Sequence, residues 1–230
     1  MNEQELRKDI VLNVVHGSRA YGTNIPGSDF DEKGIAIISD PRYYFGFKKF
    51  EQKDSGWEDG NDRAIYDIRK FFKLALACNP NIIEVLFVEP EQILTMTHYG
   101  QEILNFRRSF LSRSAAKTFT GYALAQMKRL KNGVDAGKEI KWKHAMHLVR
   151  LLRMGIEIVK TGEVKVKRPD AKYLKEIRFG NVPLEEIFRD SEMLLERIDN
   201  ALARSPLPRE PDRDGAEKLM VKLIRRNMRI

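Results

Sequence analysis

The stretch VHGSRAYG (residues 15–22), followed closely by SDFD (residues 28–31), decides the fold of the first part of the chain. The apolar, β-branched run 10–15 ahead of it predicts a buried strand that stops at the Gly-Ser pair. The run 29–38 predicts a second strand, alternating at first and then continuously apolar. The sequence therefore predicts two strands joined by a Gly- and Ser-containing turn, with two aspartates at the start of the second strand.

These glycine, serine and aspartate residues suit phosphate chemistry. Because side chains alternate along a strand, Asp29 and Asp31 share a face, and both carboxylates can bind the same divalent ions. Mg²⁺ commonly takes one or two carboxylates together with substrate phosphates. Gly17 lets the backbone approach a triphosphate closely, and Ser18 offers a hydroxyl and an amide as donors. A DxD pair alone is common on exposed strand ends, but the Gly-Ser pair ahead of it favours phosphate transfer.

The rest of the first ninety residues reads as mixed α/β. The polar segment 50–62 predicts a mobile hairpin or loop. Residues 64–67 predict a short strand that runs into a helix over 68–77, whose apolar positions share one face. The segment 79–87 fits either a helix or a strand.

From about residue 98 onward the hydrophobic pattern becomes helical. We therefore predict an α/β (α+β) fold, with a small domain containing a short mixed sheet over residues 1–100 and a basic all-helical domain over 101–230. The boundary falls near residues 95–110. The predicted elements of the second part are a helix from Ser112 or Ser114 to about 131, a helix over 141–161 ended by Gly162, a helix from Pro183 to about 203, an extended linker over 205–211 and a last helix over 215–228.

Composition narrows the class of protein. The 230 residues are 42% hydrophobic and 32% charged, which predicts a soluble globular chain and argues against disorder. No apolar run approaches the roughly 18–20 residues needed to cross a bilayer, and the polar start MNEQELRKD predicts no signal peptide. The one cysteine, Cys78, cannot form an internal disulfide and reads as a packed apolar residue, so a reducing, cytoplasmic setting is expected.

The net charge of +8 is unevenly distributed. Residues 1–100 carry 12 Lys and Arg against 16 Asp and Glu, a net charge of −4. Residues 101–230 carry 29 against 17, a net charge of +12. This asymmetry predicts that the second part gathers anions, although Lys- and Arg-rich helix surfaces also occur for solubility alone.

The combination GSxxYG…SDxD resembles the signature of the DNA polymerase β-like nucleotidyltransferase superfamily, and in particular predicted nucleotidyltransferases found beside RNA-repair genes and in large phages. The resemblance spans most of residues 12–195. It continues through YDIRKFFKLALACNPNIIEVLF (66–87), GYALAQMKRL (121–130) and KHAMHLVRLLRMGIEIVKTGEV (143–164).

The resemblance implies a two-metal transfer of an NMP from an NTP to a hydroxyl acceptor on RNA, DNA or a protein. Asp29 and Asp31 would bridge two Mg²⁺ ions, with Mn²⁺ as an alternative. Superfamily members normally supply a third carboxylate from a neighbouring strand, for which Asp67 is the candidate. Glu84 is the second choice if 82–87 is a strand. Asp67 equally suits a helix N-cap, and Glu84 a buried ion-pair partner.

The resemblance also implies where the NTP binds. Lys143, His147 and Arg150 lie on one face of the helix 141–161, in the helical block that matches best, and suit a triphosphate or an acceptor backbone. The alternative is a solvated helix face with a core histidine. Arg19 suits a phosphate contact, and Tyr21 suits loop support or base stacking, unless both are scaffolding. The expected NTP-binding set is therefore Gly17, Ser18, Arg19, Tyr21, Lys143, His147 and Arg150.

The helix 114–131 carries a basic face with an aromatic residue. Lys117, Tyr122, Gln126, Lys128 and Arg129 suit a nucleic-acid acceptor, and equally a soluble helix. The chain contains no zinc-ligand spacing, P-loop or nucleophile elbow. Two other functions compete with nucleotidyl transfer to nucleic acid. One is a nucleic-acid-binding module that has lost catalysis, and the other is an antitoxin-like enzyme that nucleotidylates another protein.

Overall fold

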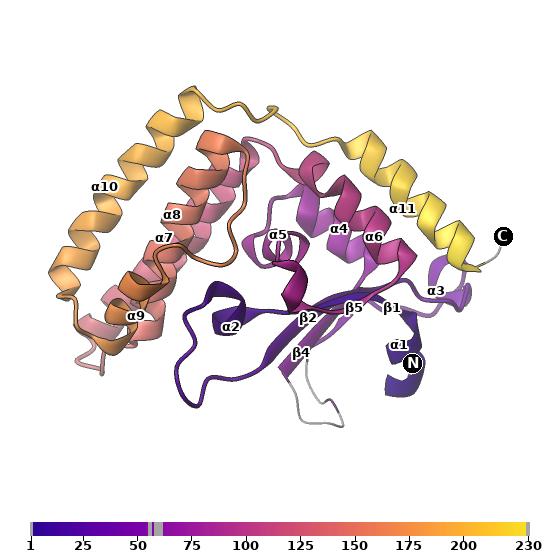
Figure 1. Cartoon of the computed structure of the whole chain (residues 1–230), viewed down its shortest axis with the longest axis horizontal. Coiled ribbons are helices and arrows are strands. Elements are labelled where there is room, and N and C mark those ends of the chain that lie inside the picture. Colours follow the sequence, from indigo (N-terminus) through magenta and orange to yellow (C-terminus); the bar gives the residue numbers. More distant parts are fainter. Residues whose placement is uncertain (1, 55–56, 58–61, 229–230) are drawn as a thin grey trace.

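The first part of the chain forms a mixed sheet (Figure 1). The computed structural model describes residues 2–54, 57 and 62–228, and within these residues the strand order is β3-β4-β2-β1-β5. β2 and β4 run parallel, whereas β1 pairs antiparallel with β2 and with β5, and β4 pairs antiparallel with β3. The strands are β1 Ile10–Val15, β2 Asp31–Ala36, β3 Gln52–Lys53, β4 Asp62–Asp67 and β5 Ile93–Met96.

Alternation along β2 explains how both faces of the sheet are covered. Ile35 belongs to the main core, whereas its neighbour Ala36 belongs to a smaller cluster with Leu6 of the N-terminal helix. Figure 1 shows helices α4, α5 and α6 over one face, with α1 and α3 at the end of the sheet away from α2. The same alternation places Asp31 and Lys33 on the face of Ile35, toward the main core.

Local signals in the sequence set several helix ends. The segment 79–87, which fits either a helix or a strand, is helical because the Asn79 side chain accepts the N–H of Asn81 and Pro80 occupies the first turn. Gly162 ends α8 in the left-handed conformation, as the sequence predicts. The helices are α1 Glu3–Asp9, α2 Gly17–Tyr21, α3 Arg42–Phe45, α4 Ile68–Leu76, α5 Pro80–Leu86, α6 His98–Phe106, α7 Ser114–Asp135, α8 Trp142–Thr161, α9 Ala171–Phe179, α10 Leu184–Ala203 and α11 Arg213–Met228, with 3-10 turns at Pro90–Gln92 and Arg107–Phe110.

The second part of the chain is helical, as predicted, and its core is continuous with that of the sheet. One cluster of buried side chains contains both Val11 of β1 and Leu152 of α8. α7, α8 and α10 pack together, whereas α11 returns to the first part and lies against α4 and α6 (Figure 1). The last helix of the predicted second domain therefore contacts the first, and the division into 1–100 and 101–230 stays a prediction.

The linker before α11 is tied down at the junction where α7 begins. The Arg113 guanidinium donates to the carbonyls of Ser205 and Leu207, at 2.9 and 3.0 Å. The Arg113 N–H donates to the Pro208 carbonyl at 2.9 Å, and the Ser205 hydroxyl donates to the Val159 carbonyl at 2.5 Å. The extended segment is thus held along its length by the helices that it crosses.

Some predicted bounds shift for physical reasons. The second strand covers Asp31–Ala36 instead of the predicted 29–38, so Asp29 precedes the strand and does not share its alternation with Asp31. At the other end the N–H of Ile37 donates to the carbonyl of Asp9, which lies outside β1. The predicted hairpin over 50–62 contains β3, while its residues 55–56 and 58–61 lie outside the described part of the chain. Among the helices of the described residues, none combines the length and apolar character that a bilayer span needs.

Gly34→Ala should destabilise the sheet. An added Cβ would lie 2.4 Å from the carbonyl oxygen of Leu12, a backbone atom that cannot move aside. We expect the free energy of unfolding to fall by about 3 kcal/mol, the upper end of the usual cost of overpacking. Urea titration followed by circular dichroism measures this loss.

Gly133→Ala in α7 is the matched control, since nothing lies within 4 Å of its added Cβ. Helix propensity should then stabilise the protein by about 0.5–1 kcal/mol. Equal effects of the two substitutions would contradict the proposed cause.

Candidate active site

Gly17 brings the end of β1 against the start of β2. Its φ is 65°, a left-handed conformation that favours glycine. An added Cβ at this position would lie 1.9 Å from Oδ2 of Asp31, so the Asp31 carboxylate lies directly against the Gly17 backbone. The N–H of His16 donates to the Asp31 carbonyl at 2.8 Å and fixes the two segments to each other. The Gly-Ser turn and the second aspartate of the DxD pair are therefore neighbours.

Asp62 is an acidic neighbour of Asp31 that sequence reasoning missed. Asp31 and Asp62 are register partners at the start of the parallel strands β2 and β4, so their side chains share a face. Burial raises the pKa of Asp31, and the nearby charges of Asp62 and Asp29 raise it further. The sequence predicts a strand that begins at residue 64 and leaves Asp62 in the loop before it. In the structure β4 begins at Asp62, and its buried positions include the charged Arg63 and Asp67, so the apolar pattern of the sequence does not reveal its full length.

The structure does not bring Asp67 to Asp29 and Asp31. Asp67 ends β4 and pairs with Ala36, five positions beyond the pairing of Asp31 with Asp62, or about 16 Å along the strands. Its side chain accepts the N–H of Arg69 and caps α4, which is the alternative reading of this residue. Asp67 is far from the Gly-Ser turn because it lies at the opposite end of β4 from Asp62.

Arg19 acts on the loop that carries Asp29. Its Nε donates to the Asp29 carbonyl, and one of its Nη atoms donates to the Ser28 carbonyl, both at 3.2 Å. Ser18 accepts the N–H of Thr23 through its own carbonyl at 2.9 Å, which closes the turn after α2. The guanidinium expected to contact phosphate is thus engaged with backbone carbonyls, while the half-buried Ser18 lies beside Gly17.

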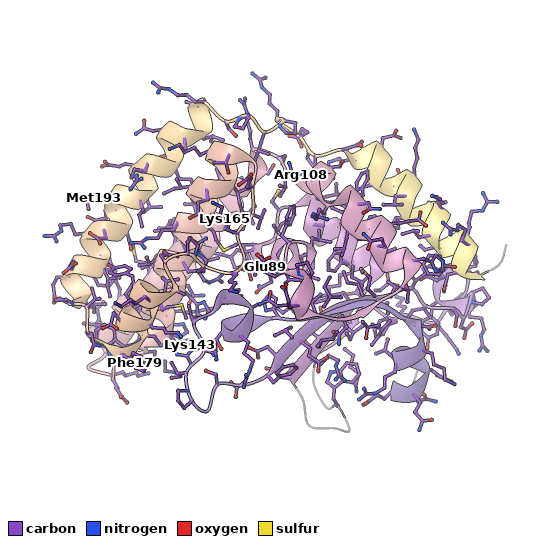
Figure 2. The ribbon with its side chains drawn as sticks, in the orientation of Figure 1. Glu89, Arg108, Lys143, Lys165, Phe179 and Met193 are labelled. Atoms are coloured by element: carbon purple, nitrogen blue, oxygen red, sulfur yellow. The ribbon has the colours of Figure 1, made fainter. Side chains whose placement is uncertain are left out.

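Two lysines bring positive charge to the carboxylates. Lys33 follows Asp31 by two positions on the same face of β2, and its Nζ donates to Oδ1 of Asn81 at 3.1 Å. Burial lowers the pKa of Lys33, against the opposing effect of the Glu84 and Asp31 charges. Lys143 lies at the start of α8, beside the loop after α2 in Figure 2, and its charge opposes the rise in the pKa of Asp31. The sequence singles out Lys143, as an NTP-binding residue, and does not single out Lys33, although the spacing of Lys33 from Asp31 is visible in it.

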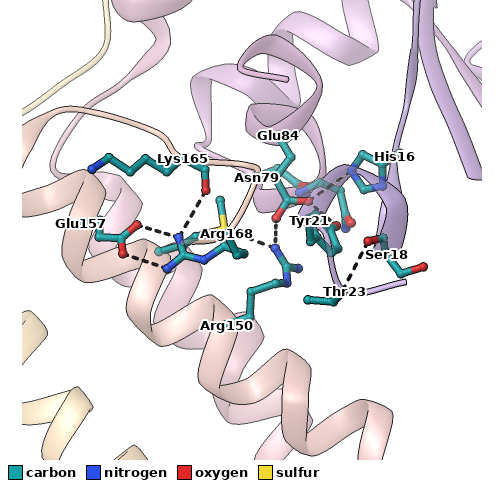
Figure 3. A network of polar contacts seen from close by, with 12 residues as sticks. His16, Ser18, Tyr21, Thr23, Asn79, Glu84, Arg150, Glu157, Lys165 and Arg168 are labelled. Atoms are coloured by element: carbon teal, nitrogen blue, oxygen red, sulfur yellow. Dashed lines mark hydrogen bonds and ion pairs between the residues drawn. The ribbon is translucent and has the colours of Figure 1, made fainter. Parts of the chain in front are cut away.

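Glu84 is buried at the centre of a polar network (Figure 3). The Tyr21 hydroxyl donates to its Oε2 at 2.6 Å, and Arg150 of α8 forms an ion pair with its Oε1. Nε2 of His16 lies 3.1 Å from Oε2. The Arg150 guanidinium also lies over the Tyr21 ring, 3.8 Å from its centre. Glu84 is therefore the buried ion-pair partner of the alternative reading, on a helix rather than a strand.

A second ion-pair group holds Tyr21 from the other side (Figure 3). The N–H of Arg168 donates to the Tyr21 carbonyl at 3.0 Å. The buried Arg168 guanidinium donates to both carboxylate oxygens of Glu157, at 2.6 and 2.8 Å, and to Asp170 at 3.0 Å. The segment after α8 thus fixes the Gly-Ser turn at its far end.

Burial and neighbouring charges set the protonation of this network at neutral pH. Burial by itself raises the pKa of Glu84, but Arg150 and the contacts with His16 and Tyr21 outweigh it and hold this pKa well below its usual range. Burial lowers the pKa of His16 to about 4, and the charge of Lys33 acts in the same direction. Burial lowers the pKa of His147 to about 3, helped by Arg150. Glu84 is therefore ionised and both histidines are neutral at pH 7.

A cavity of about 730 Å³ opens beside this network. Tyr21, His147 and Arg150 line it, so three of the expected NTP-binding residues meet at one hollow. Asn81, which accepts from Lys33, lines the same hollow and links it to the carboxylates. Lys143 lies outside this lining, on the side of Asp31. The volume suits a ligand of nucleotide size.

In this protein, aspartates of the sheet lie beside a Gly-Ser turn, next to a cavity lined by helices that carry basic residues. This arrangement is expected of a polymerase β-like nucleotidyltransferase. The model of the RNA repair pathway DNA polymerase beta family matches residues 1–178, and the chain belongs to this family.

Two further proteins are similar to the chain. An uncharacterized 38.9 kDa protein of the nrdC-mobD intergenic region of Enterobacteria phage T4 is 23% identical over 192 residues, which cover 79% of this chain and 56% of the phage protein. The chain thus spans little more than half the length of that relative. A nucleotidyltransferase-like protein from Exiguobacterium sibiricum 255-15 superposes with a TM-score of 0.31 at 13% identity, over 99% of this chain and 79% of that one.

Glu84→Gln should destabilise the protein strongly. The amide cannot neutralise Arg150, which would remain charged and buried, and the loss of one partner of a buried ion pair typically costs about 3–5 kcal/mol. Tyr21→Phe removes one hydrogen bond to the same carboxylate and should cost about 1 kcal/mol. Urea unfolding of both variants measures the difference. A loss for Glu84→Gln no larger than that for Tyr21→Phe would show that the ion pair does not hold α8.

Acid should weaken the fold through the buried histidines. In the unfolded chain each imidazole binds a proton near pH 6.5, whereas in the folded chain His16 and His147 bind one only near pH 4 and 3. The unfolded state therefore binds more protons in this window, and stability falls as the pH falls. Between pH 6.5 and 5 we expect a loss of about 1.6 kcal/mol per histidine. His147→Gln should flatten this dependence in urea titrations at stepped pH, and an unchanged slope would contradict the assignment.

Proposed function

We propose that the chain is a Mg²⁺-dependent nucleotidyltransferase that moves an NMP from an NTP to a hydroxyl of an RNA or DNA strand. The observation that carries this proposal is the position of Asp31. Its carboxylate lies against the Gly17 backbone and beside Asp62 of the neighbouring parallel strand. Phosphate-binding backbone and metal-binding carboxylates at one point are what nucleotidyl transfer requires.

The aspartates fit a divalent cation. Asp31 has a raised pKa, due first to burial and then to Asp62, which is the electrostatic situation that a cation relieves. The described residues contain no ready-made group of three metal-binding side chains, but Mg²⁺ usually relies on one or two carboxylates together with phosphates. Asp29, Asp31 and Asp62 would hold Mg²⁺, with Mn²⁺ as an alternative. The bound ions would supply charge neutralisation of the triphosphate and a more acidic acceptor hydroxyl.

The remaining residues of the site bind and orient the substrates. Gly17 and Ser18 offer backbone and hydroxyl donors to the triphosphate, and Arg19 keeps the loop of Asp29 in place. Lys33 and Lys143 offset the charge that gathers on the departing pyrophosphate. In the transfer, the acceptor oxygen bonds to the α-phosphorus, the bond to pyrophosphate breaks and the hydroxyl proton passes to solvent.

The acceptor proposal draws on charge and family. Residues 101–230 carry a net charge of +12, as expected of a surface that binds a polyanion. The family is described as one of an RNA repair pathway. Both point to a nucleic-acid strand rather than a protein acceptor.

Asp31→Asn and Asp62→Asn should each lower the transfer of labelled NMP to an RNA oligonucleotide by about 100-fold or more, as expected when a charge that stabilises the transition state is lost. Asp67→Asn should retain both activity and fold, because this residue caps α4 and an asparagine side chain caps a helix as well as an aspartate does. Gel analysis of the labelled oligonucleotide in Mg²⁺ measures the transfer, with circular dichroism as the folding control.

The opposite pattern would overturn the assignment of the third carboxylate. If a folded Asp67→Asn variant lost transfer while Asp62→Asn kept it, Asp67 would be the third carboxylate after all. If wild type and Asp31→Asn were equally inactive with every NTP and with RNA and DNA acceptors, the proposed activity would fail.

A further inference from the structure

The hairpin of α7 and α8 carries two hollows that meet at one residue. The cavity described above is lined on the side of α7 by Lys117, Tyr122 and Arg129. A second hollow of about 380 Å³ begins at the same Arg129 and follows the turn between the two helices. The two hollows therefore adjoin at Arg129, and we call them together the hairpin groove, defined by the residues that line either hollow.

The first hollow contains a buried polar group without a partner. The Arg150 side chain is 4% exposed and lines this hollow, and its Nε makes no hydrogen bond among the described residues. A buried donor left unpaired is costly, and a polar ligand would relieve it. The Tyr122 ring lies in the same lining, 36% exposed, with its hydroxyl oxygen fixed by the Asn79 amide at 2.7 Å. A fixed, open aromatic ring is a stacking platform for a base.

The second hollow is basic and leads away from the carboxylates. Arg129, Lys138 and Lys141 line it, and none of them has an ion-pair partner within the described chain. Glu139 is the one acidic side chain in the described lining. A hydrogen bond of 2.8 Å joins Gln126, in the lining of the first hollow, to His144, in the lining of the second.

The groove is longer than a single nucleotide needs. From Lys117 in the first hollow to Val134 in the second, the path follows α7 for about 26 Å. The first hollow is linked to the carboxylates through Asn81 and Lys33. A mononucleotide bound at Asp31 would leave the cations of the second hollow unused, whereas a strand would engage both hollows.

We propose that the hairpin groove binds a single-stranded nucleic acid, with the terminal nucleotide in the first hollow against Tyr122 and Arg150 and the following phosphates along Arg129, Lys138 and Lys141. This inference rests on the proposed function, since it assigns the acceptor of that site. Single strands suit it better than duplexes, because a hollow lined by one aromatic ring takes an unpaired base.

The test measures binding rather than transfer. Fluorescence anisotropy, in EDTA and without NTP, is recorded for labelled single strands of 4 and 12 nucleotides, in oligo(rU) and oligo(dT) forms, and for a 12-base-pair duplex. The variant is Lys138→Ala/Lys141→Ala. The matched control is Lys160→Ala/Arg204→Ala, which removes the same charge at exposed positions outside both hollows.

The groove variant should bind the 12-mer about tenfold more weakly than wild type and lower the slope of log affinity against log salt by about 1.4, the value for two lost phosphate contacts on a single strand. The 4-mer and the control variant should change less than twofold. Tyr122→Ala should weaken both lengths by about tenfold, and Tyr122→Phe, which keeps the ring, should restore them. Tighter binding of rU or of dT supports the proposal in either case and identifies the strand.

Three results would overturn the proposal: equal losses for the groove variant and its control, equal affinity for 4-mer and 12-mer, or a duplex bound more tightly than the single strand. If the wild-type protein showed this binding pattern but transferred no NMP, the proposed chemistry alone would be refuted. If the wild-type protein transferred NMP without this binding pattern, the groove alone would be refuted.

Discussion

The carboxylate of Glu84 joins three parts of the molecule that are far apart in the chain. It accepts the Tyr21 hydroxyl at the end of α2, lies beside His16 at the end of β1 and pairs with Arg150 of α8. A charge buried this completely is tolerated only because its partners surround it. The Glu84–Arg150 ion pair therefore fastens α8, which forms one wall of the cavity, to the Gly-Ser turn. The N–H of Arg168 donates to the Tyr21 carbonyl, so Tyr21 is held through its backbone as well as through its hydroxyl.

The carboxylates of the candidate active site differ from Glu84, because they place like charges close together, whereas the charge of Glu84 is paired with Arg150. Asp31 and Asp62 lie side by side because β2 and β4 are parallel and in register, and Gly17 leaves room for the Asp31 carboxylate. The lysines that balance them come from β2 itself and from α8. The site thus depends on the sheet for its negative charges and on both parts of the chain for its positive ones.

Local sequence patterns predicted most of the fold but only part of the site. β1, the end of α8 at Gly162 and the neighbourhood of Gly17 and Asp31 follow from residues close together in the chain. The position of Asp62 depends on the pairing of β4 with β2, and a single sequence contains no signal for strand register. The sequence favours Asp67 for the same reason, since the length of β4 decides which of its ends meets the turn. The sequence offers the buried role of Glu84 only as an alternative, because the segment around it fits a helix and a strand equally.

The linker between α10 and α11 has a mechanical consequence. Its hydrogen bonds to Arg113 are made at the point where the chain leaves the α/β part and enters α7. The chain therefore passes between its two parts twice, once before α7 and once before α11, and hydrogen bonds join these two connecting segments. A motion that widened the cavity would have to proceed as rotation about this fixed pivot, because separation of the two parts would break the bonds at both crossings at once.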